Sequence, residues 1–347
     1  MQTSEHTVMF NYIKEKIILK PLFIMLVGIS GSGKTTAGEK IKEEVIKNGN
    51  KIELLSSDNL REELLGDVND QSQNAVIFKE MQKRTINALQ QNCSVIYDAT
   101  NLNIKDRKNI LQTIINLKID CYKIAYIIPT AFSLCVANNT NRERIVPYEV
   151  LKRQLHKFQV PLYQEGFNFI FVAGYSCSDF YNQFYQGYNV PITEPWVWLS
   201  HMKNFNQENH HHHFSLLEHS VLTYEEILRT TRKYGEKNIE LEYAGLLHDF
   251  GKIKTKVKND KGEFSYYGHA NVGAYNFLQN LDKLGLHSFK QVLYCIALIN
   301  YHMEPFGWEE AKNITVEKKK MFFGEKMYND LMLLHKADKY ACTGKRN

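Results

Sequence analysis

The sequence lacks closely spaced cysteines. It has six cysteines among its 347 residues but no C-x-x-C motif. Scattered cysteines in a chain of this size indicate reduced thiols and an intracellular protein, not a disulfide-stapled secreted one. The six are Cys93, Cys121, Cys135, Cys177, Cys295 and Cys342.

Long hydrophobic runs are missing as well. The longest apolar runs are too short to cross a bilayer, and the N-terminal residues MQTSEHTVMFNYIKEK lack the architecture of a signal peptide. We therefore expect a cytoplasmic protein without a membrane partner.

Neither sign of charge dominates the chain. The net charge is +5 and the isoelectric point is about 8.6, which is compatible with a polyanionic substrate but does not identify one. A composition of 44% hydrophobic and 23% charged residues is ordinary for a globular protein, and the length allows two domains. No internal repeat is present.

The most informative stretch is LFIMLVGISGSGKTT, residues 22–36. Its first six residues predict a buried parallel strand, and a turn of the pattern G-x-x-x-x-G-K-[ST] follows before a predicted helix. Lys34 is placed to bridge the β- and γ-phosphates of ATP, and the Thr35 hydroxyl to hold Mg²⁺. The alternative is a glycine-rich turn that binds nothing. The residues expected to bind ATP and Mg²⁺ are Gly28, Ser30, Gly31, Ser32, Gly33, Lys34, Thr35 and Thr36.

Strands and helices alternate over the first half of the chain, which predicts a parallel sheet with both faces covered by helices. We expect strands at residues 22–27, 51–56, 94–97, 123–128 and 168–172. We expect helices at residues 37–47, 72–91, 105–117 and 148–157.

Polar residues follow two of these strands, where open α/β sheets bind ligands. Asp58 is placed to accept a proton from an attacking hydroxyl, and Arg61 to hold an acceptor phosphate or to orient Asp58. The alternative is an N-cap aspartate beside a solvated arginine. Asp98 is placed near the Mg²⁺ water shell, and its alternative is a turn-forming residue.

A polar stretch, residues 138–144, carries Arg142 and Arg144 ahead of Pro147. Such a loop can close on ATP and bring a guanidinium to the transferring phosphoryl group. An ordinary surface loop remains the alternative.

The segments GISGSGKTT, SDNLR, YDATNLN and NRERIVPYEVL resemble the kinase domain of phage-type polynucleotide 5′-kinases. The resemblance implies that Lys34 and Thr35 bind ATP and Mg²⁺, that Asp58 is the general base, and that Arg61 contacts the acceptor. It also implies that Asp98 shapes the site near Arg61 and that Arg142 is the lid arginine, with Arg144 as a rival. Asn138 departs from the family pattern, which has an arginine there.

The second half is different in character. Residues 174–209 are rich in Tyr, Asn, Gln and Ser and predict a connector, and helices are expected at 215–233, 239–250, 269–280, 290–301 and 325–340. His248 and Asp249 form a doublet at the end of an apolar helix, followed by Gly251 and Lys252. Imidazole and carboxylate groups together suit Mn, Fe, Co, Ni or Zn.

This half resembles the HD phosphohydrolase superfamily, an all-helical metal-dependent fold. The resemblance implies one metal ion at His219, His248, Asp249 and Asp338, a second at His269 and His302, and Lys252 near a substrate phosphate. The run His210–His213 is either a further phosphate contact or a polar lead-in to the first helix. His156, His201, His287 and His335 have no assigned role.

We therefore expect an α/β P-loop kinase domain at residues 1–173, a connector at 174–208 and an all-α HD domain at 209–347. The whole chain resembles RNA end-healing enzymes that phosphorylate 5′-OH ends and remove 3′-phosphate or 2′,3′-cyclic phosphate ends. The expected cofactors are ATP, Mg²⁺ and one or two divalent transition-metal ions, and the expected partners are RNA or DNA ends and a separate RNA ligase. Both a monomer and a homo-oligomer are compatible with the sequence. If the chain is encoded by a phage, the expected location is the cytoplasm of the host cell. The alternatives are a small-molecule or nucleoside kinase fused to a nucleotide phosphohydrolase, and a non-catalytic ATP-gated switch.

Overall fold

The computed structural model describes residues 20–142, 144–174, 196–203, 205–208, 214–233, 235, 237–258, 262–286, 288–308 and 312–343. The chain divides into two compact units, residues 1–182 and 183–347. The predictions made for Cys177, His210–His213 and His287 lie outside the described residues.

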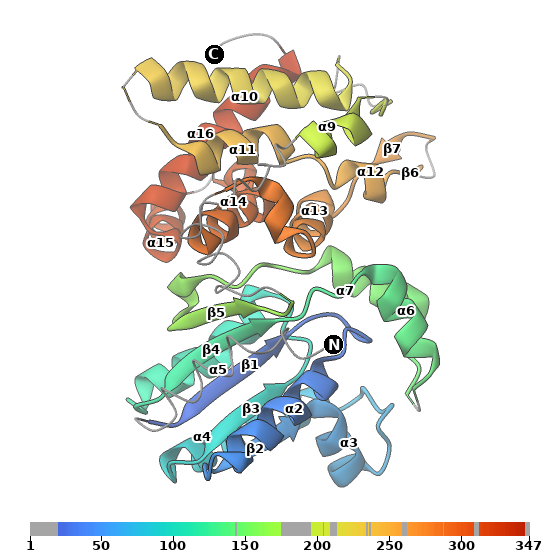
Figure 1. Cartoon of the computed structure of the whole chain (residues 1–347), viewed down its shortest axis with the longest axis vertical. Coiled ribbons are helices and arrows are strands. Elements are labelled where there is room, and N and C mark those ends of the chain that lie inside the picture. Colours follow the sequence, from blue (N-terminus) through green and yellow to red (C-terminus); the bar gives the residue numbers. More distant parts are fainter. Residues whose placement is uncertain are drawn as a thin grey trace, which may run out of the picture. The chain divides into compact units, whose positions relative to one another are not determined.

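A five-stranded parallel sheet forms the centre of the first unit, as predicted (Figure 1). Its strand order is β2-β3-β1-β4-β5, and every neighbouring pair is parallel. The carboxyl ends of all five strands therefore lie at one edge of the sheet. The strands are β1 (Leu22–Val27), β2 (Ile52–Ser56), β3 (Ser94–Asp98), β4 (Tyr122–Ile127) and β5 (Phe169–Val172).

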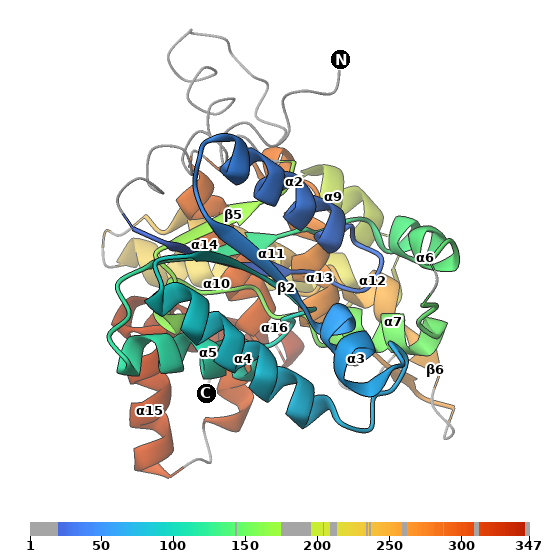
Figure 2. The ribbon, with the colours of Figure 1, turned by 90° about the horizontal axis from the view of Figure 1, so that it is seen from below.

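Helices cover both faces of this sheet (Figure 2). The alternate residues Leu22, Ile24 and Leu26 of β1 pack against α2 (Lys34–Lys47), and all three are fully buried. The helices α4 (Asn74–Gln90) and α5 (Ile104–Asn116) lie on the opposite side. Because successive strand side chains point to opposite faces, a continuous apolar run such as β1 requires cover on both.

Three further helices surround the carboxyl edge of the sheet. They are α3 (Ser57–Leu65), α6 (Phe132–Thr140) and α7 (Tyr148–His156). The Ser56 side chain caps α3 by accepting a hydrogen bond from the Asp58 N–H, so Asp58 lies in the first helical turn. Asn138 and Asn139, expected in a polar loop, belong to α6 instead, because the apolar start of that helix at Phe132 continues through them.

The second unit is largely helical, as predicted (Figure 1). A two-stranded antiparallel ribbon, β6 with β7, interrupts the helices and was not expected from the sequence. Each of its strands has two residues, too few for a pattern of alternating hydrophobicity. The elements are α9 (Trp196–Met202), α10 (Leu216–Lys233), α11 (Ile239–Leu247), α12 (Lys252–Thr255), β6 (Val257–Lys258), β7 (Phe264–Ser265), α13 (His269–Leu278), η2 (Leu281–Leu284), α14 (Phe289–Tyr301), η3 (Glu304–Gly307), α15 (Asn313–Phe323) and α16 (Glu325–Thr343).

Aromatic packing joins the end of the predicted connector to the helical unit. The indole of Trp198, in α9, meets the rings of Phe250 and Phe277 edge to face, each at a centroid distance of 5.1 Å. None of the described helices combines the length and the hydropathy needed to span a membrane.

Candidate active sites

The turn between β1 and α2 has the backbone that a phosphate loop needs. Gly31 and Gly33 have φ angles of 78° and 88°, in the left-handed region that favours glycine. A Cβ atom on Gly31 would lie 2.2 Å from the carbonyl oxygen of Cys135, so α6 also approaches too closely for a side chain. The Lys34 ammonium donates to the carbonyl oxygen of Ile29 at 2.8 Å, which folds the lysine back over the turn.

Thr35 and Asp98 are joined directly across the sheet edge. The Thr35 hydroxyl donates to Oδ2 of Asp98 at 2.8 Å. Burial raises the pKa of Asp98, although the Lys34 charge and the Thr35 hydrogen bond oppose this. Burial likewise lowers the pKa of Lys34 against the opposing charge of Asp98. A hydroxyl and a carboxylate at this separation are suitable ligands for Mg²⁺, directly or through water.

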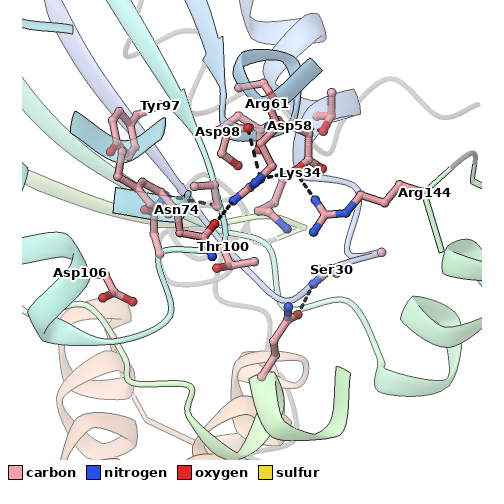
Figure 3. Close-up of a pocket in the computed structure, with 18 of the residues that line it drawn as sticks. Ser30, Lys34, Asp58, Arg61, Asn74, Tyr97, Asp98, Thr100, Asp106 and Arg144 are labelled. Atoms are coloured by element: carbon pink, nitrogen blue, oxygen red, sulfur yellow. Dashed lines mark hydrogen bonds and ion pairs between the residues drawn. The ribbon is translucent and has the colours of Figure 1, made fainter. Parts of the chain in front are cut away.

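A cavity of about 1100 Å³ opens beside these residues (Figure 3). Its walls include Lys34, Thr35 and Thr36 at one end, with Asp58, Arg61 and Asp98 beside them. Gly28 and Ser32, also expected to bind nucleotide, do not line it. The Ser32 side chain is buried, and the carbonyl oxygen of this residue accepts a hydrogen bond from the Thr130 hydroxyl at 2.7 Å.

Three arginines converge on Asp58 in this cavity, and Figure 3 shows two of them, Arg61 and Arg144. Arg61 donates to Oδ1 at 2.8 Å, Arg144 donates to the same oxygen, and Nη2 of Arg142 lies 3.7 Å from Oδ2. The structure thus brings both candidate lid arginines to the carboxylate. Arg61 is buried and also donates to Oδ1 of Asn74 at 2.7 Å, so its guanidinium is fixed from two sides.

Two polar residues hold the phosphate loop from α6 and α7, Asn138 from the predicted lid stretch and Gln154, which the sequence analysis did not find. Oε1 of Gln154 accepts the Ser30 N–H at 2.8 Å, and Asn138 donates to the Gly31 carbonyl at 2.9 Å. A glutamine in an amphipathic helix gives no sequence signal, because only the packing of α7 against the loop distinguishes it from a solvated one.

Six histidine and aspartate side chains gather in the second unit, from five places in the sequence. All six residues are buried. His219 belongs to α10 and Asp338 to α16. The pair His248 and Asp249 directly follows α11. The remaining two histidines lie at the start of α13 and directly after α14. The six are His219, His248, Asp249, His269, His302 and Asp338.

Asp249 lies between two pairs of histidines. Its Oδ2 atom is 3.3 Å from Nε2 of His219 and 3.3 Å from Nε2 of His248. Its Oδ1 atom is 3.1 Å from Nε2 of His269 and 3.8 Å from Nε2 of His302. One carboxylate therefore faces both halves of the cluster.

Backbone carbonyls orient three of the imidazoles. Nδ1 of His248 lies 2.8 Å from the Gly245 carbonyl oxygen, and Nδ1 of His302 lies 2.7 Å from that of Ile299. Nδ1 of His269 lies 3.0 Å from the Tyr266 carbonyl oxygen in the same way. A proton held at Nδ1 leaves the Nε2 lone pair for a metal ion, which is how metal-binding histidines are usually oriented.

Family comparisons agree with this geometry. The AAA domain family model matches residues 23–161. The HD domain family model matches residues 216–342. No curated protein matched the chain. The first unit is thus a P-loop kinase-like domain, and the second contains an HD domain.

The HD domain offers a donor set that fits divalent metal ions. Two groups have ligand atoms within 4.8 Å of one another among the described residues. Nitrogen and oxygen donors in this mixture suit Mn, Fe, Co, Ni or Zn. The groups are His219, His248 and Asp338, and His248, Asp249 and His302.

The charges of the cluster are closely coupled. Burial disfavours the charged form of His248, but Asp249 and Asp338 outweigh it and raise its pKa to about 9. Burial and the neighbouring His248 and His269 lower the pKa of His302 to about 3. Asp338 keeps a pKa well below its ordinary value because the hydrogen bonds from His219 and His248 outweigh its burial.

Lys252 lies beside the shared carboxylate. Its Nζ atom is 2.7 Å from Oδ2 of Asp249 and donates to Oε1 of Gln207 at 3.0 Å. The Tyr266 hydroxyl in turn donates to the carbonyl oxygen of Gln207. Gln207 is the residue here that sequence reasoning did not find, since the connector gave no motif.

Proposed function

We propose that this chain is a bifunctional nucleic-acid end-healing enzyme. Its P-loop domain would phosphorylate 5′-OH ends with ATP, and its HD domain would remove 3′-phosphate or 2′,3′-cyclic phosphate ends. The single observation that carries the proposal is that one chain holds both Asp58 among three arginines beside a phosphate loop and a buried histidine–aspartate cluster. The domain limits proposed are 1–173, 174–208 for the connector and 209–347.

Asp58 would act as the general base of the kinase reaction. It lines the same cavity as Lys34 and the phosphate loop, and its carboxylate would accept the proton of the attacking 5′-hydroxyl. Its hydrogen bond to Arg61 fixes the carboxylate. Arg144 and Arg142 line the same cavity and would contact the transferring phosphoryl oxygens after turning from Asp58. Guanidinium groups stabilise the negative charge of that transition state.

In the HD domain, His219, His248, Asp249 and Asp338 would hold one metal ion, and Asp249, His269 and His302 a second. Bound metal would supply Lewis acidity and lower the pKa of a water molecule. Lys252 would hold a substrate phosphate oxygen, because its ammonium lies against the shared carboxylate at the buried cluster.

The test is one RNA oligonucleotide with a 5′-OH and a 3′-phosphate, incubated with ATP, Mg²⁺ and a panel of transition metals, with both ends mapped. Lys34→Ala and Asp58→Asn are expected to abolish 5′-phosphorylation and leave 3′-phosphate removal intact. His248→Ala and Asp249→Ala are expected to do the reverse. Loss of both activities from either single change, in a folded protein, contradicts two independent sites.

The acceptor decides between this function and its alternative. Phosphorylation of mononucleosides in preference to oligonucleotides identifies a nucleoside kinase instead. A separate ligase that joins the healed ends is part of the proposal, and ligation of the treated RNA by a purified RNA ligase tests it.

A further inference from the structure

The cavity of the P-loop domain extends beyond the residues that the proposed reaction uses. Asn74, Phe78 and Gln82 line it from α4, and the spacing of four residues places them in one stripe along that helix. Tyr97 and Asp106 lie in the part of the cavity away from Lys34 (Figure 3). A groove between α4 and α5, with the end of β3 as its floor, therefore continues from the reaction centre.

Unused hydrogen-bonding groups point to a ligand in this groove. Tyr97 is only 5% exposed and lines the cavity, yet its hydroxyl forms no hydrogen bond with any residue that the structure describes. Asn109, an exposed residue of α5, also lines the cavity, and its side-chain amide has no hydrogen-bond partner among the described residues. Both groups open onto the cavity, where a ligand could take their hydrogen bonds.

The groove also offers an aromatic face. The Phe78 side chain lines the cavity and is 39% exposed. Gln82 donates to the Thr113 hydroxyl at 2.5 Å, which fixes its amide and leaves Oε1 as an acceptor. The groove thus combines an aromatic ring with nearby hydrogen-bond donors and acceptors. This combination suits a nucleobase, which stacks on aromatic residues and forms hydrogen bonds at its edge.

A chain of contacts joins the groove to the reaction centre. Arg61 donates to Asp58 at 2.8 Å and to Asn74 at 2.7 Å, and Asn74 begins the stripe that contains Phe78. A group bound in the groove is thus next to the carboxylate that would receive the acceptor's proton.

We propose that this groove is a base-binding subsite for the nucleotide that carries the 5′-hydroxyl, with Phe78 as its stacking surface and Tyr97, Gln82 and Asn109 at the base edge. The inference rests on the proposed kinase function and names the acceptor as a nucleotide with its base in place. It requires no contact with the next nucleotide of the strand.

The experiment compares two acceptors, a 5′-OH RNA oligonucleotide and the same oligonucleotide with an abasic first nucleotide, at saturating ATP. Phe78→Ala is expected to raise KM for the first by about tenfold, and Tyr97→Phe by about fivefold. Both variants are expected to change KM for the abasic acceptor and for ATP by less than about twofold, since the lost contacts are to the base. Val76→Ala, at a half-exposed position of α4 outside the cavity, is the matched control and should behave as wild type.

Equal effects on both acceptors contradict the base subsite, and a selective rise in KM for ATP assigns the groove to adenine instead. A wild-type protein that phosphorylates neither oligonucleotide contradicts the kinase function and this inference with it. Folding of both variants is checked by circular dichroism, and Tyr97→Phe keeps the ring that packs against Phe23 at a centroid distance of 5.7 Å.

Discussion

Arg107 and Glu165 form a fully buried, bidentate ion pair in the P-loop domain. Nε of Arg107 lies 2.8 Å from Oε2 of Glu165, and Nη2 lies 2.8 Å from Oε1. Both side chains are 0% exposed. Arg107 also donates to the carbonyl oxygens of Asn101 and Gln159, so the pair ties the segment after β3 to the segment after α7.

Removing one member of this pair leaves a buried charge without its partner. We expect Glu165→Gln to lower the free energy of unfolding by about 3–5 kcal/mol. Because Asn101 lines the cavity, kinase activity should fall along with stability. Denaturant unfolding of the full chain measures the effect, and Glu63→Gln, at an exposed ion pair with Arg84, is the control with no measurable change expected. If both variants lower the free energy of unfolding equally, the burial of the Arg107–Glu165 pair does not increase its contribution to stability.

Gly251 allows α12 to approach α13 closely. A Cβ atom at this position would lie 2.0 Å from the His269 carbonyl oxygen and 2.7 Å from the Gly273 nitrogen. Gly251→Ala is therefore expected to displace His269 and abolish phosphate removal, with 5′-phosphorylation unchanged. Thermal unfolding and end mapping check this. Gly307→Ala, where a Cβ atom meets nothing within 4 Å, is the matched control. An active Gly251→Ala variant refutes the expectation.

The placement of the histidine pairs on either side of Asp249 predicts how many metal ions each variant binds. His269→Ala removes a ligand from one side of Asp249 only, so we expect the variant to bind one metal ion per chain, against the two ions proposed for the wild type. Asp249→Ala removes the shared ligand and is expected to lose both. Metal content is measured by mass spectrometry after reloading and desalting, with His201→Ala as the control outside the cluster. Retention of two ions by Asp249→Ala excludes a bridging carboxylate.

Protons and metal ions compete for His248. In the metal-free protein its pKa is raised to about 9, so below that pH the imidazole carries a proton that a metal ion must displace. Metal affinity is thus expected to rise with pH by about tenfold per unit for each proton released, and to level off above pH 9. The protonated pair with Asp249 stabilises the metal-free fold below the unfolded pKa of about 6.5, and this contribution is lost as the pH rises through about 9. Calorimetry in two buffers of different ionisation enthalpy counts the protons, and a pH-independent affinity contradicts the expectation.

Local patterns predicted the parallel sheet and the phosphate loop well. The apolar run Leu22–Val27 and the glycines after it specify a strand, a turn and a helix through neighbouring residues alone. The distribution of His219 and Asp338 over distant helices followed from the resemblance, and the structure places them together.

Long-range packing explains what the sequence did not predict. Gln154 contacts Ser30 across 124 positions of the chain, and no local pattern distinguishes it from a solvated helix residue. The sequence also left Arg142 and Arg144 as rivals, and both lie at Asp58. The two-residue strands β6 and β7 were too short to detect.

The position of Asp249 between both histidine pairs has a consequence for the cell. If the two oxygens of Asp249 hold one metal ion each, the proposed hydrolysis would require both ions to be loaded together, and it should depend steeply on transition-metal supply. The proposed phosphoryl transfer from magnesium-bound nucleotide would have no such dependence. During metal starvation, broken strands would then gain their 5′-phosphates while their opposite ends stayed blocked, so scarcity would halt repair at a half-finished and recoverable stage.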